Sequence, residues 1–229
     1  MTEIVISDTK SDMATAAAAR VATAIERAVR ERGSCSVALA GGGTPRPVYE
    51  ALTQREDLPW DRVAFYFGDE RCVPPGDPDS NYRMACEALL NAHPAAEVHR
   101  MEGELEDRDA AASAYGAALP DQLDVLLLGM GGDGHTASLF PGDDAIDERT
   151  RRVVVVHGPK PPPWRLTITP LVIESAREVL VLVSGAGKAT TVARALDETT
   201  TARELPIKLA LSGTWFLDRD AAGELKRTP

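Results

Sequence analysis

An aspartate and a histidine stand two residues apart in a glycine-rich turn, where their side chains can carry proton-transfer chemistry. Asp133 and His135 lie in the run Gly129–Thr136, which contains four glycines and follows the apolar segment Leu123–Leu128. Histidine titrates near neutral pH, and a neighbouring carboxylate can orient it. Glycine lets the backbone bend sharply and come close to a ligand. The pattern predicts an acid–base site at the end of a buried strand.

The same turn has two other possible interpretations. Its glycines fit the dinucleotide pattern G-x-G-x-x-G, which also needs a long helix and an acidic residue about 20 positions further on. Pro141 and Gly142 end any helix early, and the next apolar segment, Val153–Val156, is followed by His157 and not by an acid. The dinucleotide interpretation is therefore rejected, while a glycine-rich turn without chemistry stays open.

A second glycine-rich run, Gly41–Thr44, follows another short apolar segment and precedes Pro45. Thr44 is a favoured N-cap residue, and proline is favoured as the first helical residue. Glycines before a helix leave backbone N–H groups free beside the positive end of the helix dipole. The run predicts a cradle for a phosphate or another anion, and a plain strand-to-helix turn is the alternative.

Charged side chains follow the apolar segment Val63–Phe67 directly. Asp69, Glu70 and Arg71 form either a surface ion pair or part of a cleft, and their position at the end of a strand favours the cleft. Because ligands of open α/β sheets bind at the carboxyl ends of the strands, we expect the three strand-end turns to converge. Two later cations, Arg165 and Lys188, are candidates to join them.

Composition excludes several classes of protein. The chain has 229 residues and a formal net charge of −10, which repels nucleic acid and anionic membranes at long range. No apolar stretch is long enough to span a membrane, and the N-terminus lacks the pattern of a signal peptide. Three irregularly spaced cysteines do not form a disulfide framework or a metal site. These features predict a cytoplasmic protein that binds neither nucleic acid nor membrane.

Apolar segments typical of strands alternate with helical patterns along the whole chain, without a repeat or a linker. Helices are predicted at 11–32, 45–53, 80–90 and 107–119, and a last strand at 214–217. Such alternation predicts one α/β domain over residues 1–229, built around a mainly parallel sheet.

The candidate residues together suit a small phosphorylated substrate and proton transfer. The sequence has no serine in a G-x-S-x-G elbow, and its four histidines do not have the spacing of zinc ligands. We therefore expect general acid–base catalysis without a metal.

Five motifs of this chain resemble those of the glucosamine-6-phosphate isomerase/6-phosphogluconolactonase family, and of its lactonase branch in particular. They are Ala40–Pro45, Phe67–Arg71, Gly129–Pro141, Arg165–Thr167 and Gly187–Lys188. They occur in the order of the family and span nearly the whole chain. The resemblance implies a Rossmann-like α/β fold with helices on both faces of the sheet. It also implies the hydrolysis of 6-phospho-D-glucono-1,5-lactone to 6-phospho-D-gluconate, a step of the oxidative pentose phosphate pathway, without a cofactor.

The same resemblance implies roles for individual residues. His135 would be the general base, and Asp69 and Arg71 would lie against the sugar and its reacting end. The phosphate would be held by Arg165, Lys188 and the backbone of Gly42, Gly43 and Thr44.

Two details of this mechanism stay open in the sequence. Either Asp133 or Asp69 orients the histidine. Lactone hydrolysis also forms an oxyanion, which either the N–H groups of Gly131–Gly134 or the side chain of Arg71 stabilises.

Two rival functions are compatible with the same fold. An amino-sugar phosphate isomerase or deaminase would carry tyrosine in place of Arg71 and a further glutamate after the histidine, where this chain reads Thr136–Phe140. A non-catalytic sugar-phosphate sensor would carry a DNA-binding helix-turn-helix, for which no residues remain before the strand expected at Ile4. The lactonase is favoured, acting on a small sugar phosphate as a monomer or a small homo-oligomer.

Overall fold

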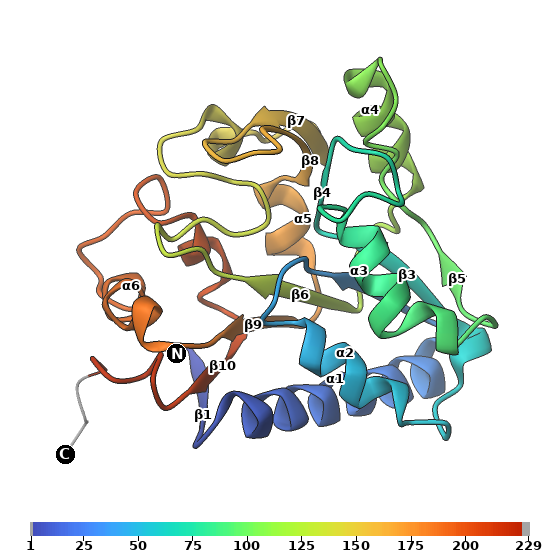
Figure 1. The fold of residues 1–229 in the computed structure, drawn as a ribbon, viewed down its shortest axis with the longest axis horizontal. Coiled ribbons are helices and arrows are strands. Elements are labelled where there is room, and N and C mark those ends of the chain that lie inside the picture. The colour runs from blue at the N-terminus through green and yellow to red at the C-terminus, as the bar shows by residue number, and fades with distance from the viewer. Residues whose placement is uncertain (1, 226–229) are drawn as a thin grey trace.

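A parallel sheet of seven strands forms the centre of the molecule (Figure 1). The computed structural model describes residues 2–225, so residue 1 and residues 226–229 of the predicted domain lie outside the described residues. In spatial order the strands are β1 (Glu3–Ser7), β10 (Thr214–Asp218), β9 (Val179–Val183), β6 (Val125–Gly129), β2 (Cys35–Leu39), β3 (Val63–Phe67) and β5 (Glu97–Val98). The inner strands are apolar runs buried on both faces, as parallel sheets require.

Helices cover both faces of this sheet, as predicted. They are α1 (Lys10–Arg32), α2 (Arg46–Thr53), α3 (Asn81–Ala88), α4 (Arg108–Ala118), α5 (Pro170–Ser175) and α6 (Ala189–Ala195). Single 3₁₀ turns lie at Trp60–Arg62, Leu90–Ala92, Asp144–Asp147, Ala186–Lys188 and Pro206–Ala210. Crossovers between parallel strands are right-handed, so connections that run toward β5 lie on one face and those that run toward β1 lie on the other. In Figure 1, α1 and α2 lie below the sheet and α4 and α5 above it.

The residues at the two ends of α1, the longest helix, explain where it begins and where it ends. The Thr9 hydroxyl accepts a hydrogen bond from the Asp12 backbone, which caps the start of α1. Gly33 ends the helix with φ +83°, a conformation that glycine adopts without strain. Its alanine-rich stripe is buried against the sheet, where small side chains permit close packing.

Two predicted starts of elements need correction. Helix α2 begins at Arg46, one residue later than predicted, and Thr44 does not cap it. The Thr44 hydroxyl instead lies 3.2 Å from that of Ser184, at the end of β9, so it joins two strand ends. Asp124 lies just before β6 and not within it, where its carboxylate accepts hydrogen bonds from Ser36.

A small antiparallel sheet, which the sequence did not predict, stands beside the main one. It has the order β4 (Asp69–Arg71), β8 (Trp164–Ile168) and β7 (Val153–His157). The charged segment at Asp69–Arg71, predicted as a turn, is therefore a three-residue strand whose backbone pairs with β8. This pairing sets Asp69 opposite Thr167 and Arg71 opposite Arg165, so that residues almost a hundred positions apart become neighbours.

The direction of the connections reverses between β2 and β6, and this reversal fixes where a ligand can bind. From β2 the chain continues to β3 and β5, whereas from β6 it continues to β9 and β10 on the other side. The loops after β2 and β6 therefore diverge and leave a crevice at the carboxyl ends of the strands. Both predicted glycine-rich turns follow these two strands.

Other sequence predictions concern features outside the sheet. No helix among residues 2–225 is both long and apolar enough to span a membrane. All three cysteines, Cys35, Cys72 and Cys86, are free thiols. The cytoplasmic location and the oligomeric state stay predictions.

An ion-pair cluster that joins α1 to β9 provides the first test. The Glu178 side chain is only 8% exposed and pairs with both Arg20 and Arg27. We expect Glu178→Gln to lower the free energy of unfolding by about 1–3 kcal/mol, because both guanidinium groups lose their carboxylate. Urea unfolding at pH 7 would measure this loss. Glu26→Gln, which removes an exposed partner of Arg55, should change stability by less than about 0.5 kcal/mol, and equal losses in the two variants would contradict the prediction.

Candidate active site

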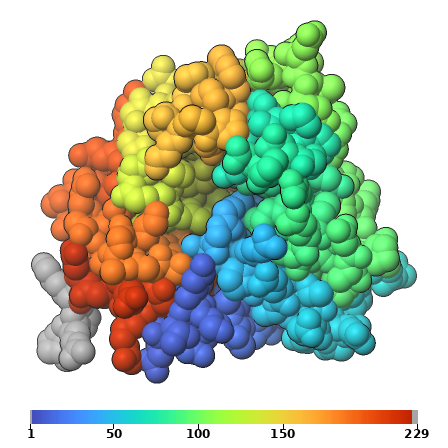
Figure 2. Space-filling model, in the orientation of Figure 1, coloured from blue at the N-terminus to red at the C-terminus, as the bar shows by residue number. Residues whose placement is uncertain are grey.

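A cavity of about 290 Å³ opens at the crevice between the ends of β2 and β6. Figure 2 shows it as a hollow near the middle of the molecule. Eight of the nine predicted site residues line it: Gly42, Gly43, Thr44, Asp69, Arg71, His135, Arg165 and Lys188. The ninth, Asp133, does not line the cavity but contacts His135.

The turn after β6 holds the histidine and the aspartate as a hydrogen-bonded pair. His135 Nδ1 lies 2.6 Å from Asp133 Oδ1, which also accepts a hydrogen bond from the His135 backbone. The Gly131 N–H donates to the carbonyl of His135, which closes the turn. A Cβ at Gly131 would lie 2.1 Å from His135 Nδ1, so only glycine fits beside the pair. Of the two carboxylates considered for orienting the histidine, Asp133 is the one in contact with it.

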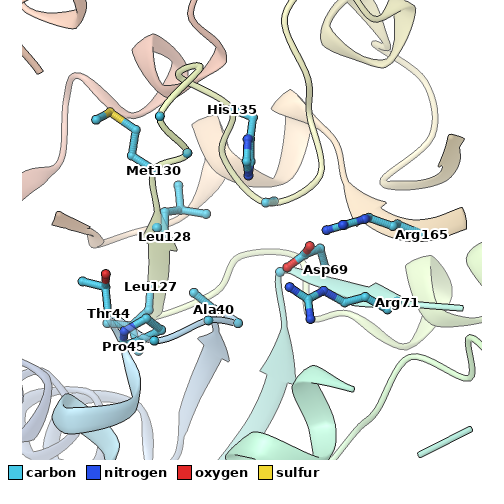
Figure 3. Close-up of a pocket in the computed structure, with 18 of the residues that line it drawn as sticks. Ala40, Thr44, Pro45, Asp69, Arg71, Leu127, Leu128, Met130, His135 and Arg165 are labelled. Carbon is cyan, nitrogen blue, oxygen red and sulfur yellow. The ribbon is translucent and has the colours of Figure 1, made fainter. Parts of the chain in front are cut away.

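This pair fixes which ring nitrogen of His135 carries the proton. The hydrogen bond from the ring is the main cause that holds the pKa of Asp133 below its usual range, against the opposing effect of burial. An ionised carboxylate can only accept hydrogen bonds, so Nδ1 is the donor. The lone pair of Nε2 is left to accept a proton, and Figure 3 shows the ring pointing into the cavity.

Asp69 lies across the cavity from the histidine and has partners of its own. One carboxylate oxygen accepts a hydrogen bond from the Ser138 hydroxyl at 2.6 Å, and the other accepts one from the Asn81 amide at 3.1 Å. Both partners are buried. The sequence does not predict these contacts, since Asn81 lies within the predicted helix 80–90 and Ser138 within the Gly129–Pro141 motif, without a role of its own in either. Their contacts hold Asp69 in a fixed position at the cavity wall.

Glu70 was predicted to share the cleft, but its side chain points away from it. The carboxylate accepts hydrogen bonds from the backbone N–H groups of Arg71, Asn81 and Tyr82, at 2.7–2.8 Å, and from the Ser80 hydroxyl. Burial raises its pKa, and these backbone donors offset that effect only in part. Because side chains alternate along β4, Asp69 and Arg71 face the cavity while Glu70 anchors the strand to the start of α3.

Three predicted cations line the cavity. Arg71 donates from Nη1 to the carbonyl of Asp79 at 2.5 Å, and its buried Nε has no partner among the described residues. Arg165 is 7% exposed, and Figure 3 shows its guanidinium directed toward the centre of the cavity. Burial lowers the pKa of Arg165 and of Lys188, because both charges have lost part of their water. A bound anion would restore favourable interactions to all three.

The turn after β2 faces these cations with its backbone. The N–H groups of Gly42, Gly43 and Thr44 donate to no other group in the described part of the chain. Gly42 has φ +98°, which a residue with a Cβ adopts only with strain. Free N–H groups beside the start of α2 can bind an anion even though Thr44 does not cap the helix.

One cavity residue was not recognised as such in the sequence. Lys160 lines the same cavity from the proline-rich loop between β7 and β8. The available signal was a lysine beside a run of prolines in a strongly acidic chain. In residues 2–225 no group of three or more His, Cys, Asp or Glu side chains is arranged to hold a metal ion.

Comparisons with known proteins show which family and which solved structures this chain resembles. Residues 8–217 match the family described as glucosamine-6-phosphate isomerases/6-phosphogluconolactonase. The chain is 40% identical to a 6-phosphogluconolactonase of Streptomyces coelicolor, over 99% of this chain and 95% of the relative. It is 41% identical to the one of Mycobacterium tuberculosis, over 94% and 95%. The solved structure of 6-phosphogluconolactonase from Trypanosoma brucei superposes with a TM-score of 0.87 at 31% identity, covering 99% of both chains.

The tautomer of His135 can be tested directly. We expect nitrogen NMR at a pH where the imidazoles are neutral to show the proton on Nδ1, because the ionised Asp133 accepts it. His99 is an internal control, since its Nε2 lies 2.9 Å from Glu97 and should carry the proton there. Asp133→Ala should abolish the preference of His135 without changing that of His99. A proton on Nε2 of His135 in the wild type would contradict this assignment.

Proposed function

The chain belongs to the glucosamine-6-phosphate isomerase/6-phosphogluconolactonase family, and we propose that it hydrolyses 6-phospho-D-glucono-1,5-lactone to 6-phospho-D-gluconate. The observation that carries the proposal is the Asp133–His135 pair, whose free ring nitrogen faces a cavity lined with cations. The names of the relatives support the same substrate. The reaction belongs to the oxidative pentose phosphate pathway.

The chemical step is general-base hydrolysis. His135 Nε2 takes a proton from a water molecule as its oxygen attacks C1 of the lactone. Asp133 stabilises the imidazolium that forms, because its carboxylate lies 2.6 Å from Nδ1. When the tetrahedral intermediate collapses, the bond from C1 to the ring oxygen breaks, and the imidazolium returns its proton to that oxygen. The residues supply the base themselves, so the step requires no metal.

Arg71 is the stronger of the two candidates for stabilising the oxyanion. Among the three glycines of the turn, Gly131 and Gly134 already donate their N–H groups, to His135 and to Gly131 respectively, which leaves the N–H of Gly132. The buried Nε of Arg71 has no partner among the described residues, and the side chain lines the cavity. The negative charge that develops on the carbonyl oxygen of C1 would be stabilised by the guanidinium of Arg71.

The phosphate is the second anionic group that the cavity has to hold. We assign it to Arg165, Lys188 and the free N–H groups of Gly42, Gly43 and Thr44, while Asp69 accepts from the sugar hydroxyls. Partly desolvated cations and preorganised amides bind phosphate well, because less water has to be removed from them on binding.

The two rival functions have less support. Arg71 occupies the cavity position where an isomerase would carry tyrosine, and no glutamate occurs in the segment Thr136–Phe140. A sensor would not need a histidine whose tautomer is fixed. Turnover of glucosamine 6-phosphate would support the isomerase, and tight binding of sugar phosphates without turnover would support the sensor.

The catalytic role of His135 is tested by a matched pair of variants. The lactone is generated from glucose 6-phosphate with its dehydrogenase, and acid release is followed against a blank without enzyme. We expect His135→Gln to lower kcat by about 10²–10⁴-fold, because the general base is lost. His99→Gln removes another carboxylate-paired histidine, outside the cavity, and should keep wild-type turnover. Near-normal turnover in His135→Gln would remove this residue from the mechanism.

The role of Arg165 is tested by comparing substrates with and without phosphate. Arg165→Ala should raise the KM for the phosphorylated lactone by about tenfold or more, since charge-assisted hydrogen bonds to the phosphate are lost. The KM for glucono-1,5-lactone should change much less. Arg219→Ala, which removes an exposed cation paired with Asp8, serves as the control. Equal effects on both lactones would place Arg165 away from the phosphate.

A further inference from the structure

We propose that Lys160 is a further substrate-binding residue, which contacts the phosphate from the proline-rich loop between β7 and β8. The inference rests on the proposed function and adds a residue to the same site. Lys160 and Lys188 line one cavity, although they come from different loops. Of the five lysines in the sequence, four lie in the described residues, and two of these four line this cavity.

The backbone of Lys160 is held by the buried Arg165. The guanidinium donates from Nε to the carbonyl of Pro162 at 3.2 Å and from Nη2 to the carbonyl of Lys160 at 3.4 Å. The Gly158 N–H donates to the carbonyl of Pro163 at 2.7 Å, which closes the base of the loop. Proline residues restrict the backbone between these contacts. The ammonium group therefore extends from a stiff support.

Arg165 both holds this loop and contributes a charge to the cavity. Two of its nitrogen atoms bind the loop, while its guanidinium reaches the cavity from β8 (Figure 3). A phosphate bound at Arg165 would therefore lie next to the segment that carries Lys160. Arg165 is therefore a cation of the cavity itself, and it also holds the backbone of the loop that carries Lys160.

Lys160 has no carboxylate partner among the described residues, in a chain with 35 acidic and 25 basic side chains. The pKa of Lys188 is lowered first by burial and further by the charge of Lys160, while Asp133 opposes these effects. A phosphate dianion would attract the positive charges of both Lys160 and Lys188.

Calorimetric binding of 6-phosphogluconate tests the inference without depending on turnover. We expect Lys160→Met to weaken binding by about tenfold, and Lys160→Arg to keep most of the affinity because it keeps the charge. Arg62→Met removes an exposed cation far from the cavity and should bind as the wild type does. Lys160 is exposed, so its variants should keep the wild-type melting temperature.

Three outcomes would overturn the inference, and they are distinguishable. Wild-type affinity in Lys160→Met would show that this lysine does not contact the ligand. An equal loss of affinity for unphosphorylated gluconate would show that Lys160 does not recognise the phosphate. If the wild type binds no 6-phosphogluconate, the proposed function fails and this inference fails with it. In kinetics, the expected change is a higher KM with kcat nearly unchanged.

Discussion

The reversal of strand order between β2 and β6 is the constraint on which the site depends. Parallel strands end at the same edge of a sheet, but their following loops usually cover that edge. Here the loops after β2 and β6 leave in opposite directions, so the edge between them stays open. One loop then offers free backbone N–H groups, and the other offers the histidine. Neither loop could form a binding site alone, because each supplies only one type of group.

The small antiparallel sheet completes the cavity by bringing like charges together. The register of β4 and β8 sets Arg71 beside Arg165, an arrangement that costs energy unless an acid or a ligand compensates for it. Asp69 supplies part of that compensation, since it is the main favourable charge acting on Arg165. Asp69 is in turn fixed by Ser138, from the turn that carries His135. The histidine turn and the arginine pair are thus connected through one buried hydrogen bond.

The sequence predicted features that depend on neighbouring residues and missed those that depend on tertiary pairing. The strand before the His135 turn and the ends of α1 follow from apolar runs, caps and glycines, which act within a few residues. The strand Asp69–Arg71 has no such signal, because three charged residues form a strand only when β8 is present to pair with them. For the same reason the sequence predicts Thr44 as a cap, whereas its hydroxyl contacts that of Ser184, the residue after β9. Asp133 could not be chosen over Asp69 until the turn placed its carboxylate against the ring.

Recognition of an anion by a chain of net charge −10 has to be local. At physiological salt the field of the surface carboxylates is screened beyond about 8 Å, so it opposes the approach of a phosphate weakly and the final contact hardly at all. Inside the cavity the cations have lost water and act on the ligand with less screening. A few buried charges therefore outweigh many exposed ones. The same loss of water keeps the unliganded cations at higher free energy, and binding of the phosphate releases part of that energy at the place where the substrate must be held.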